Sequence, residues 1–180
     1  MHTMDNVVLI GMPGAGKSTV GVVLAKRLGY RFVDSDLVIQ EQENMLLHQI
    51  IEEKGLAGFL EVENKANAKI QAKRSVIATG GSVIYGREAM AHLKEIGMVV
   101  YLQLSCPAIE ERLGDLHERG VALREGQTLQ DLYRERVPCY EKYADFTVDC
   151  EGRRIREIVA EIADFFKLYS GDRYEKENNG

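Results

Sequence analysis

The sequence predicts an α/β protein with a parallel sheet of about five strands, covered by helices on both faces. Short apolar runs alternate with longer amphipathic segments along the chain. This alternation is typical of parallel strands that are joined by helical crossovers. The apolar runs are continuous rather than alternating with polar residues, as expected of strands that are buried on both faces.

The apolar runs predict five strands, at residues 7–10, 31–33, 75–78, 98–104 and 146–148. Helical spacing predicts helices at residues 17–28, 36–53, 57–73, 86–95 and 128–143, with two more after Pro107 and from about Arg153. We expect a break near Gly55 and an irregularity at Pro138. Residues 115–127 are polar and contain two glycines, so we expect a mobile loop there.

The composition favours one soluble, folded domain. The chain has 180 residues, of which 45% are hydrophobic and 28% charged, and we assign residues 1–170 to a single domain followed by a disordered tail at 171–180. The net charge of −5 argues against sequence-independent binding of nucleic acid. No apolar run approaches the ~20 residues of a membrane span. We therefore expect neither a nucleic-acid nor a membrane partner.

The N-terminal residues and the cysteines indicate a cytoplasmic location. The first residues lack a basic stretch followed by an apolar block, so we expect no signal peptide. Cys106, Cys139 and Cys150 are odd in number and show no CxxC spacing. Free thiols in a reducing compartment are the simplest interpretation.

The strongest motif is GMPGAGKS at Gly11–Ser18, which fits GxxxxGK[ST] directly after a strand and at the beginning of a helix. Its glycines let backbone N–H groups turn inward around phosphate oxygens, and the helix N-terminus adds positive potential. We expect Lys17 to reach the β- and γ-phosphates and Ser18 to ligate Mg²⁺. A glycine-rich turn that only begins a helix is the alternative, but a chance match at all fixed positions is rare.

Two aspartates, Asp34 and Asp36, follow the second strand. A carboxylate at the end of a strand beside a phosphate loop can hold Mg²⁺. A second carboxylate two residues later can accept a proton from a substrate hydroxyl. The alternative is structural, because Ser35 or Asp36 could cap the helix that follows.

Together these residues resemble the shikimate kinases, a group of small P-loop kinases, from about Val7 to Phe166. The matching segments are GMPGAGKST, DSD, the GF..E stretch at Gly58–Glu63, TGG at Thr79–Gly81, Arg112 and Arg119, and RxPxY at Arg136–Tyr140. The resemblance implies a three-layer P-loop kinase fold with a mobile lid at about 115–127, and a monomer. It also implies ATP-dependent phosphorylation of a hydroxyl on a small carboxylated metabolite, with shikimate and shikimate 3-phosphate as the expected pair.

The resemblance also implies the residues that bind ATP and Mg²⁺. The ATP phosphates would be cradled by Gly14, Ala15, Gly16, Lys17, Ser18 and Thr19. Arg112 and Arg153 would frame the adenine. Ser18 and Asp34 would hold Mg²⁺.

The acceptor and the catalytic groups follow from the same resemblance. Lys17, Asp36 and Arg119 form the implied catalytic set, with Asp36 as the base at the acceptor hydroxyl and Arg119 as the lid arginine. The implied acceptor-binding residues are Asp36, Gly80, Gly81 and Arg136. Arg136 would grip the carboxylate of the acceptor.

This chain departs from the family pattern at two positions in the acceptor site. Leu60 stands where the pattern has an arginine that forms half of a carboxylate clamp, which removes a charge-assisted contact worth ~1.5–3 kcal/mol. Arg134 and Lys65 are nearby candidates to replace it. Ser82 stands where the pattern has a third glycine, so a side chain is expected where the backbone approaches the ligand.

These departures leave other functions open. One is a kinase of another small hydroxy acid, gluconate-like or homoserine-like. Another is a nucleotide-binding protein with a degenerate acceptor site. A nucleotide switch is disfavoured because the chain has no NKxD motif, and a motor ATPase because no strand ends in a hydrophobic–Asp–Glu sequence.

Overall fold

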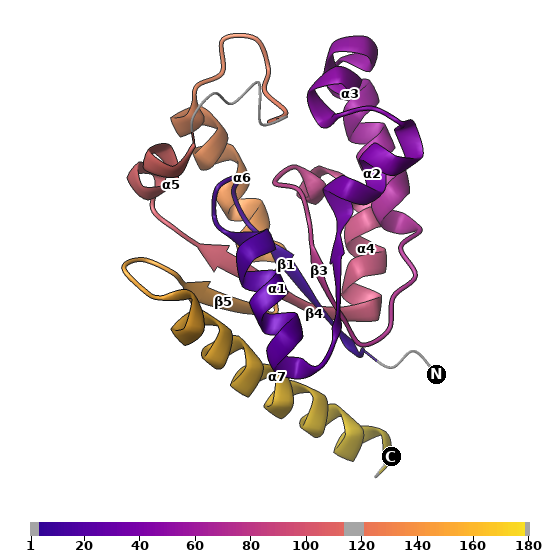
Figure 1. The fold of residues 1–180 in the computed structure, drawn as a ribbon, viewed down its shortest axis with the longest axis vertical. Coiled ribbons are helices and arrows are strands. Elements are labelled where there is room, and N and C mark those ends of the chain that lie inside the picture. Colours follow the sequence, from indigo (N-terminus) through magenta and orange to yellow (C-terminus); the bar gives the residue numbers. More distant parts are fainter. Residues whose placement is uncertain (1–3, 114–120, 179–180) are drawn as a thin grey trace.

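The computed structural model describes the backbone of residues 4–113 and 121–178, with side chains described as far as residue 170 (Figure 1). One sheet of five parallel strands forms the middle layer, which confirms the predicted fold class. Its strands are β1 Asn6–Ile10, β2 Arg31–Asp34, β3 Ser75–Ala78, β4 Gly97–Gln103 and β5 Phe146–Asp149. Their order across the sheet is β2-β3-β1-β4-β5, so β1 is central and its carboxyl end adjoins those of β3 and β4.

Helices cover the sheet on both faces, as the sequence predicts. α1 (Lys17–Leu28) packs with α7 (Ile155–Asn178) on one face, in front of the sheet in Figure 1. The other helices are α2 Ser35–Glu43, α3 Leu47–Ala68, the 3-10 helix η1 Val83–Tyr85, α4 Arg87–Ile96, α5 Cys106–Arg112 and α6 Leu129–Tyr143. η1 contacts α3, α4 and α6, which joins these helices into the second outer layer.

Two apolar clusters hold the layers together. The larger surrounds the sheet and includes all of β1 after its first residue, where Leu9 and Ile10 are fully buried. A smaller cluster lies between α2 and α3 and is made of Ile39, Ile50, Phe59, Ala66 and Ala122. Because Ala122 lies within the segment expected to form the lid, the smaller cluster joins this part of the segment to α2 and α3.

The helices after β2 differ from the prediction of a single helix over 36–53. α2 ends at Glu43, and Asn44 follows it in the left-handed conformation with φ 52°. Asparagine tolerates this conformation at a helix C-terminus, and that local preference overrides the continuous helical spacing. The expected break near Gly55 is confirmed as a kink within α3, where φ is 72°. α3 also ends at Ala68, five residues before the predicted end.

The expected disordered tail also differs from the structure, in which the backbone of α7 continues to Asn178. Ser170 lies inside this helix, where its hydroxyl donates to the carbonyl of Phe166 at 2.8 Å. Pro138 is accommodated inside α6. The three cysteines are free, as expected. Among the described residues, no helix combines the length and apolarity needed to span a lipid bilayer.

Asn6 fastens the amino-terminal edge of the sheet, at the opposite end from the phosphate loop. Its side chain is 1% exposed and makes three hydrogen bonds. The amide group donates to the carbonyls of Ala72 and Ile96, each at 2.9 Å. Its oxygen accepts from the backbone N–H of Ser75 at 3.0 Å. One buried amide therefore satisfies the chain entering β3 and the chain entering β4.

We expect Asn6→Ala to lower the free energy of unfolding by ~2–4 kcal/mol, because it leaves several buried backbone groups without partners. Urea denaturation checks this. Asn44→Gly is the control, since glycine adopts the left-handed conformation at no steric cost and should leave stability within about 0.5 kcal/mol. Equal stability of Asn6→Ala and the control would contradict the role of Asn6.

Candidate active site

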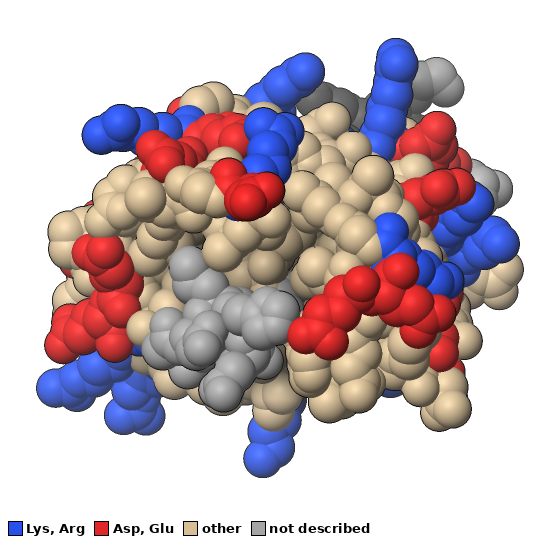
Figure 2. Space-filling view, turned by 90° about the horizontal axis from the view of Figure 1, so that it is seen from above, with Lys and Arg blue, Asp and Glu red and all other residues tan. Residues whose placement is uncertain are grey.

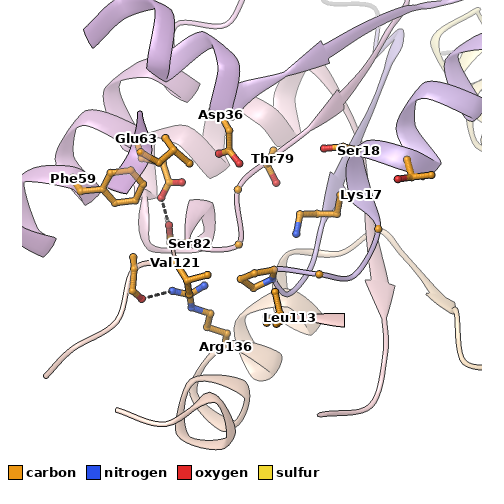
Figure 3. Close-up of a pocket in the computed structure, with 18 residues that line it drawn as sticks. Lys17, Ser18, Asp36, Phe59, Glu63, Thr79, Ser82, Leu113, Val121 and Arg136 are labelled. Atoms are coloured by element: carbon orange, nitrogen blue, oxygen red, sulfur yellow. Dashed lines mark hydrogen bonds between the residues drawn. The ribbon is translucent and has the colours of Figure 1, made fainter. Parts of the chain in front are cut away.

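A cavity of about 370 Å³ opens where the carboxyl ends of β1 and β3 meet (Figure 3). It brings together many residues that the sequence predicts for one site. The predicted residues that line it are Gly14, Gly16, Lys17, Ser18, Thr19, Asp36, Gly80, Gly81 and Arg136. Parallel pairing explains this, because the residues that follow neighbouring strands emerge at the same edge of the sheet.

The phosphate loop follows β1 and leads into α1. Gly16, the residue before the helix, has φ 91°, a left-handed conformation that favours glycine. Lys17 is 8% exposed, and its Nζ donates to the carbonyls of Gly11 at 2.7 Å and Met12 at 2.8 Å. Burial lowers the pKa of Lys17 to about 8, and the neighbouring Asp36 charge opposes that shift. Lys17 therefore presents a fixed ammonium group at the floor of the cavity.

Asp34 serves two neighbours at once. Its Oδ1 accepts from the backbone N–H of Asp36 at 2.9 Å, so Asp34 caps α2, and the alternative of a cap at Ser35 or Asp36 is wrong. Its Oδ2 accepts from the Ser18 hydroxyl at 3.2 Å. Asp34 is the residue with extended backbone before the first turn, which is the geometry that a capping side chain requires. Hydroxyl and carboxylate oxygens are the ligands that Mg²⁺ prefers, so the Ser18–Asp34 pair fits that ion.

Asp36 points from the first turn of α2 into the cavity. Its Oδ1 is buried and has no hydrogen-bond partner among the described residues. Burial and the nearby Asp34 charge raise the pKa of Asp36 to about 6, while Lys17 opposes the shift. Asp36 is thus ionised at neutral pH yet close to protonation, which suits a group that accepts a proton from a hydroxyl.

Glu63 is a cavity residue to which the sequence analysis gives no role. It lies on α3, is 2% exposed, and accepts a hydrogen bond from the Ser82 hydroxyl at 2.6 Å. Burial raises the pKa of Glu63 to about 7, whereas the Ser82 hydrogen bond lowers it. The sequence does hold one indication of a role for Glu63, its place at the end of the GF..E stretch. Glu63 comes four residues after the buried Phe59, so both side chains lie on the same face of α3.

Arg136 forms the wall opposite the carboxylates (Figure 3). It is 1% exposed, and its Nη2 donates to the carbonyl of Ala122 at 2.9 Å. Its Nε is buried without a partner among the described residues. A Cβ on Gly81 would lie 3.0 Å from Arg136 Nη1 and 2.7 Å from Pro13. The absence of a side chain at Gly81 therefore leaves the guanidinium open to the cavity.

The other predicted arginines are placed differently. Arg112 donates to the carbonyl of Gly14 at 3.5 Å, beside the phosphate loop. Arg153 pairs with Glu161 and donates to the carbonyl of Asp149 at 3.0 Å. Both positive charges lower the pKa of the Cys150 thiol, against the larger raising effect of burial, so the two guanidinium groups lie near the same side chain. Arg119 and the other residues at 115–120 of the expected lid lie outside the described residues.

The two departures from the family pattern occupy different places. Leu60 does not line the main cavity but borders a small neighbouring one together with Ala122 and Arg124. Ala122 lines both. Ser82 lines the main cavity, 4% exposed, with its hydroxyl directed to Glu63. The side chain expected to face the ligand is therefore engaged by a protein carboxylate.

Comparisons with known proteins agree with this geometry. A model of the shikimate kinase family matches residues 13–167. A shikimate kinase of Thermodesulfovibrio yellowstonii is 37% identical over 180 residues, covering 98% of this chain and 99% of the relative. The solved shikimate kinase from Acinetobacter baumannii, in complex with shikimate, superimposes with a TM-score of 0.82 at 31% identity, covering 93% and 96% of the two chains. A gluconokinase from Sinorhizobium meliloti shares the fold, with a TM-score of 0.55 at 18% identity.

The raised pKa values predict that the protein becomes less stable between pH 5 and pH 8. In this interval Asp36 and Glu63 lose protons in the folded state, whereas they are already ionised in the unfolded state. The folded state thus binds more protons, so the free energy of unfolding should fall with rising pH by on the order of 3 kcal/mol. Urea denaturation across this range, without ligands, measures it. Glu63→Gln should flatten the slope, and a wild-type stability that rises from pH 5 to pH 8 would contradict the assignment.

Proposed function

The chain belongs to the shikimate kinase family, and we propose that it transfers the γ-phosphoryl group of ATP to the 3-hydroxyl of shikimate. One observation carries the proposal. The same cavity is lined by the phosphate-loop lysine Lys17, by Asp36, whose carboxylate can act as a base, and by the buried Arg136. The loop would bind ATP, and the opposite wall would bind a small carboxylated alcohol.

Catalysis would depend on positioning and on charge neutralisation, because phosphoryl transfer passes through a loose, metaphosphate-like transition state. The backbone of Gly14–Thr19 would cradle the phosphates, and Lys17 would neutralise charge on the transferred group. Ser18 and Asp34 would hold Mg²⁺, which supplies further positive charge when bound. Arg112 and Arg153 would flank the adenine, and Arg119 would approach from the lid.

On the acceptor side, Asp36 would take the proton from the attacking hydroxyl. Its pKa of about 6 keeps it ionised at neutral pH. Arg136 would pair with the acceptor carboxylate, since its guanidinium is buried, open to the cavity and only partly satisfied. The backbone of Gly80 and Gly81 would lie against the acceptor, because neither residue has a side chain to hold it away.

The face of the molecule that contains the loops above the sheet does not suit a nucleic-acid partner. In Figure 2, which looks down on the molecule from above, acidic and basic side chains are interspersed and form no broad basic field. Binding to the nucleic-acid backbone requires such a field. We infer a monomeric cytoplasmic enzyme with ATP and a hydroxy acid as its ligands.

A lysine at the floor of the cavity should be indispensable for phosphoryl transfer. We expect Lys17→Ala to lower turnover by about three orders of magnitude or more while the protein stays folded, since a group that neutralises transition-state charge is lost. The control is Lys26→Ala, which removes an exposed lysine from the same helix. Coupled-assay kinetics and circular dichroism provide the measurements. Near-normal turnover by folded Lys17→Ala would refute the assignment.

Leu60 generates a second prediction, about the affinity for shikimate. The chain lacks an arginine there, and neither predicted substitute lines the main cavity or the small cavity beside Leu60. Lys65 pairs with Glu61 on the exposed side of α3. Burial raises the pKa of Cys106, the first residue of α5, and the charge of Arg134 opposes that shift, so Arg134 lies near Cys106. We expect a high KM for shikimate, which Leu60→Arg should lower roughly tenfold or more with little change in kcat.

Steady-state kinetics of Leu60→Arg measure the change in KM for shikimate. The control is Leu168→Arg, which changes an exposed leucine on α7. An unchanged KM in Leu60→Arg would mean that the acceptor carboxylate is already fully paired. Arg124 is then the cation to test, because it borders the same small cavity as Leu60 and lies 3.7 Å from Glu135.

A further inference from the structure

Glu135 stands directly before Arg136 on α6 and is the centre of a hydrogen-bond network beside it. Its Oε1 accepts from the Tyr85 hydroxyl at 2.6 Å, and its Oε2 accepts from Gln127 Nε2 at 2.9 Å. The Tyr85 hydrogen bond lowers the pKa of the Glu135 carboxyl, so this acceptor stays ionised at neutral pH. One carboxylate thus joins α6 to η1 and to the segment before α6.

One path leads from Glu135 through Tyr85 to the guanidinium of Arg136. Arg136 Cζ lies 5.4 Å from the centre of the Tyr85 ring, which is within the range of a cation–π contact. Burial and the Glu135 hydrogen bond raise the pKa of the Tyr85 hydroxyl, and the charge of Arg136 opposes that shift. Because Glu135 anchors the hydroxyl end of the side chain, the ring is held against the guanidinium.

A second path leads from Gln127 to the same guanidinium. The Gln127 side chain that donates to Glu135 also accepts, through Oε1, from the N–H of Arg124 at 3.1 Å. The Gln127 N–H donates to the carbonyl of Arg124 at 3.0 Å, which closes a turn, and Arg124 Nη2 lies 3.7 Å from Glu135 Oε1. Ala122, two residues before this turn, accepts from Arg136 Nη2 at 2.9 Å. Glu135 therefore fixes the turn next to the carbonyl that holds the guanidinium.

Glu135 does not line the main cavity, and its effect on an acceptor must pass through Arg136. It borders the small cavity beside Leu60 instead. Among the described residues, Arg136 is the only arginine that lines the main cavity, and Leu60 stands where the family pattern has another. The direction of a single guanidinium then decides how well a carboxylate is paired, since two parallel N–H donors require a fixed geometry.

We propose that Glu135 is a positioning residue for acceptor binding, which holds the Arg136 guanidinium toward the main cavity through these two paths. The inference rests on the proposed function, in which Arg136 pairs with the acceptor carboxylate. Without Glu135 both supports loosen, and a binding group that is held loosely pairs less well with its ligand. The acceptor carboxylate takes no part in the reacting bonds, so the loss should appear in the KM for the acceptor rather than in kcat.

Kinetics on shikimate and on its methyl ester test the proposal, because the ester keeps the hydroxyls and lacks the negative charge. We expect Glu135→Ala to raise the KM for shikimate roughly tenfold, with kcat and the KM for ATP within about twofold of wild type. The KM for the ester should change by less than about threefold, because an uncharged acceptor gains little from Arg136 in either protein. An equal rise on acid and ester, or no rise on the acid, would overturn the proposal.

The matched control is Glu141→Ala, which removes an exposed glutamate from the same helix and should change neither KM. Two milder variants separate the paths and keep the test valid where Glu135→Ala does not fold. Glu135→Gln still accepts from Tyr85 but cannot accept from Gln127 at its amide nitrogen, and Tyr85→Phe keeps the ring without the hydrogen bond. Each should raise the KM for shikimate about two- to fivefold. An unchanged KM in both would contradict the role of Glu135.

A measurement without any acceptor distinguishes failure of this inference from failure of the proposed function. The ¹⁵N NMR signal of the Arg136 Nε–H group reports how well the guanidinium is ordered. Glu135→Ala should shift or broaden this signal and Glu141→Ala should not, and an unaltered signal in Glu135→Ala overturns the positioning role. Wild type that phosphorylates no shikimate refutes the proposed function instead. An altered signal, with the same contrast between acid and ester on the hydroxy acid that it does phosphorylate, then still supports the role of Glu135.

Discussion

The parallel pairing of β1 with β3 is the constraint on which the cavity depends. The Thr79 hydroxyl strengthens this pairing at its carboxyl end by donating to the carbonyl of Leu9 at 2.8 Å, and the Thr79 N–H donates to the same oxygen. Beyond that point the chain after β1 turns into the phosphate loop, and the chain after β3 turns into Gly80 and Gly81. Two segments that are more than 60 residues apart in sequence thus become opposite walls of one cavity.

Charge balance is the second constraint. Lys17 and Arg136 are buried beside three carboxylates, those of Asp34, Asp36 and Glu63. Isolated buried charges would be prohibitively unfavourable, so the two cations and the neighbouring carboxylates offset one another in the folded protein. The uncharged backbone of Gly80 and Gly81 forms another part of the cavity wall. The Tyr140 hydroxyl donates to the carbonyl of Gly81 at 2.5 Å, which holds the glycine wall against α6.

Much of this arrangement is predictable from sequence, because it depends on local patterns. The five strands follow from continuous apolar runs, and the phosphate loop follows from the fixed spacing of glycines and Lys17. The sequence does not show which of Asp34 and Asp36 caps α2 and which points into the cavity. Either carboxylate could cap the helix, and only the backbone conformation distinguishes them. Glu63 was missed for a similar reason. The orientation of α3 depends on the packing of Phe59 and its cluster, which involves residues from α2 to Ala122.

The strand order also determines how late in translation the sheet can form. β1 leaves the ribosome first, yet both of its partners come much later, since Val7 pairs with Val76 and with Met98. α1 in turn lacks its covering helix until α7 emerges, where Phe166 meets Tyr30 edge-on at 6.0 Å between ring centroids. The nascent phosphate loop therefore remains without its supporting scaffold for most of translation. The domain must fold as a unit once nearly the whole chain is available, and its apolar first strand must be kept from aggregating until then.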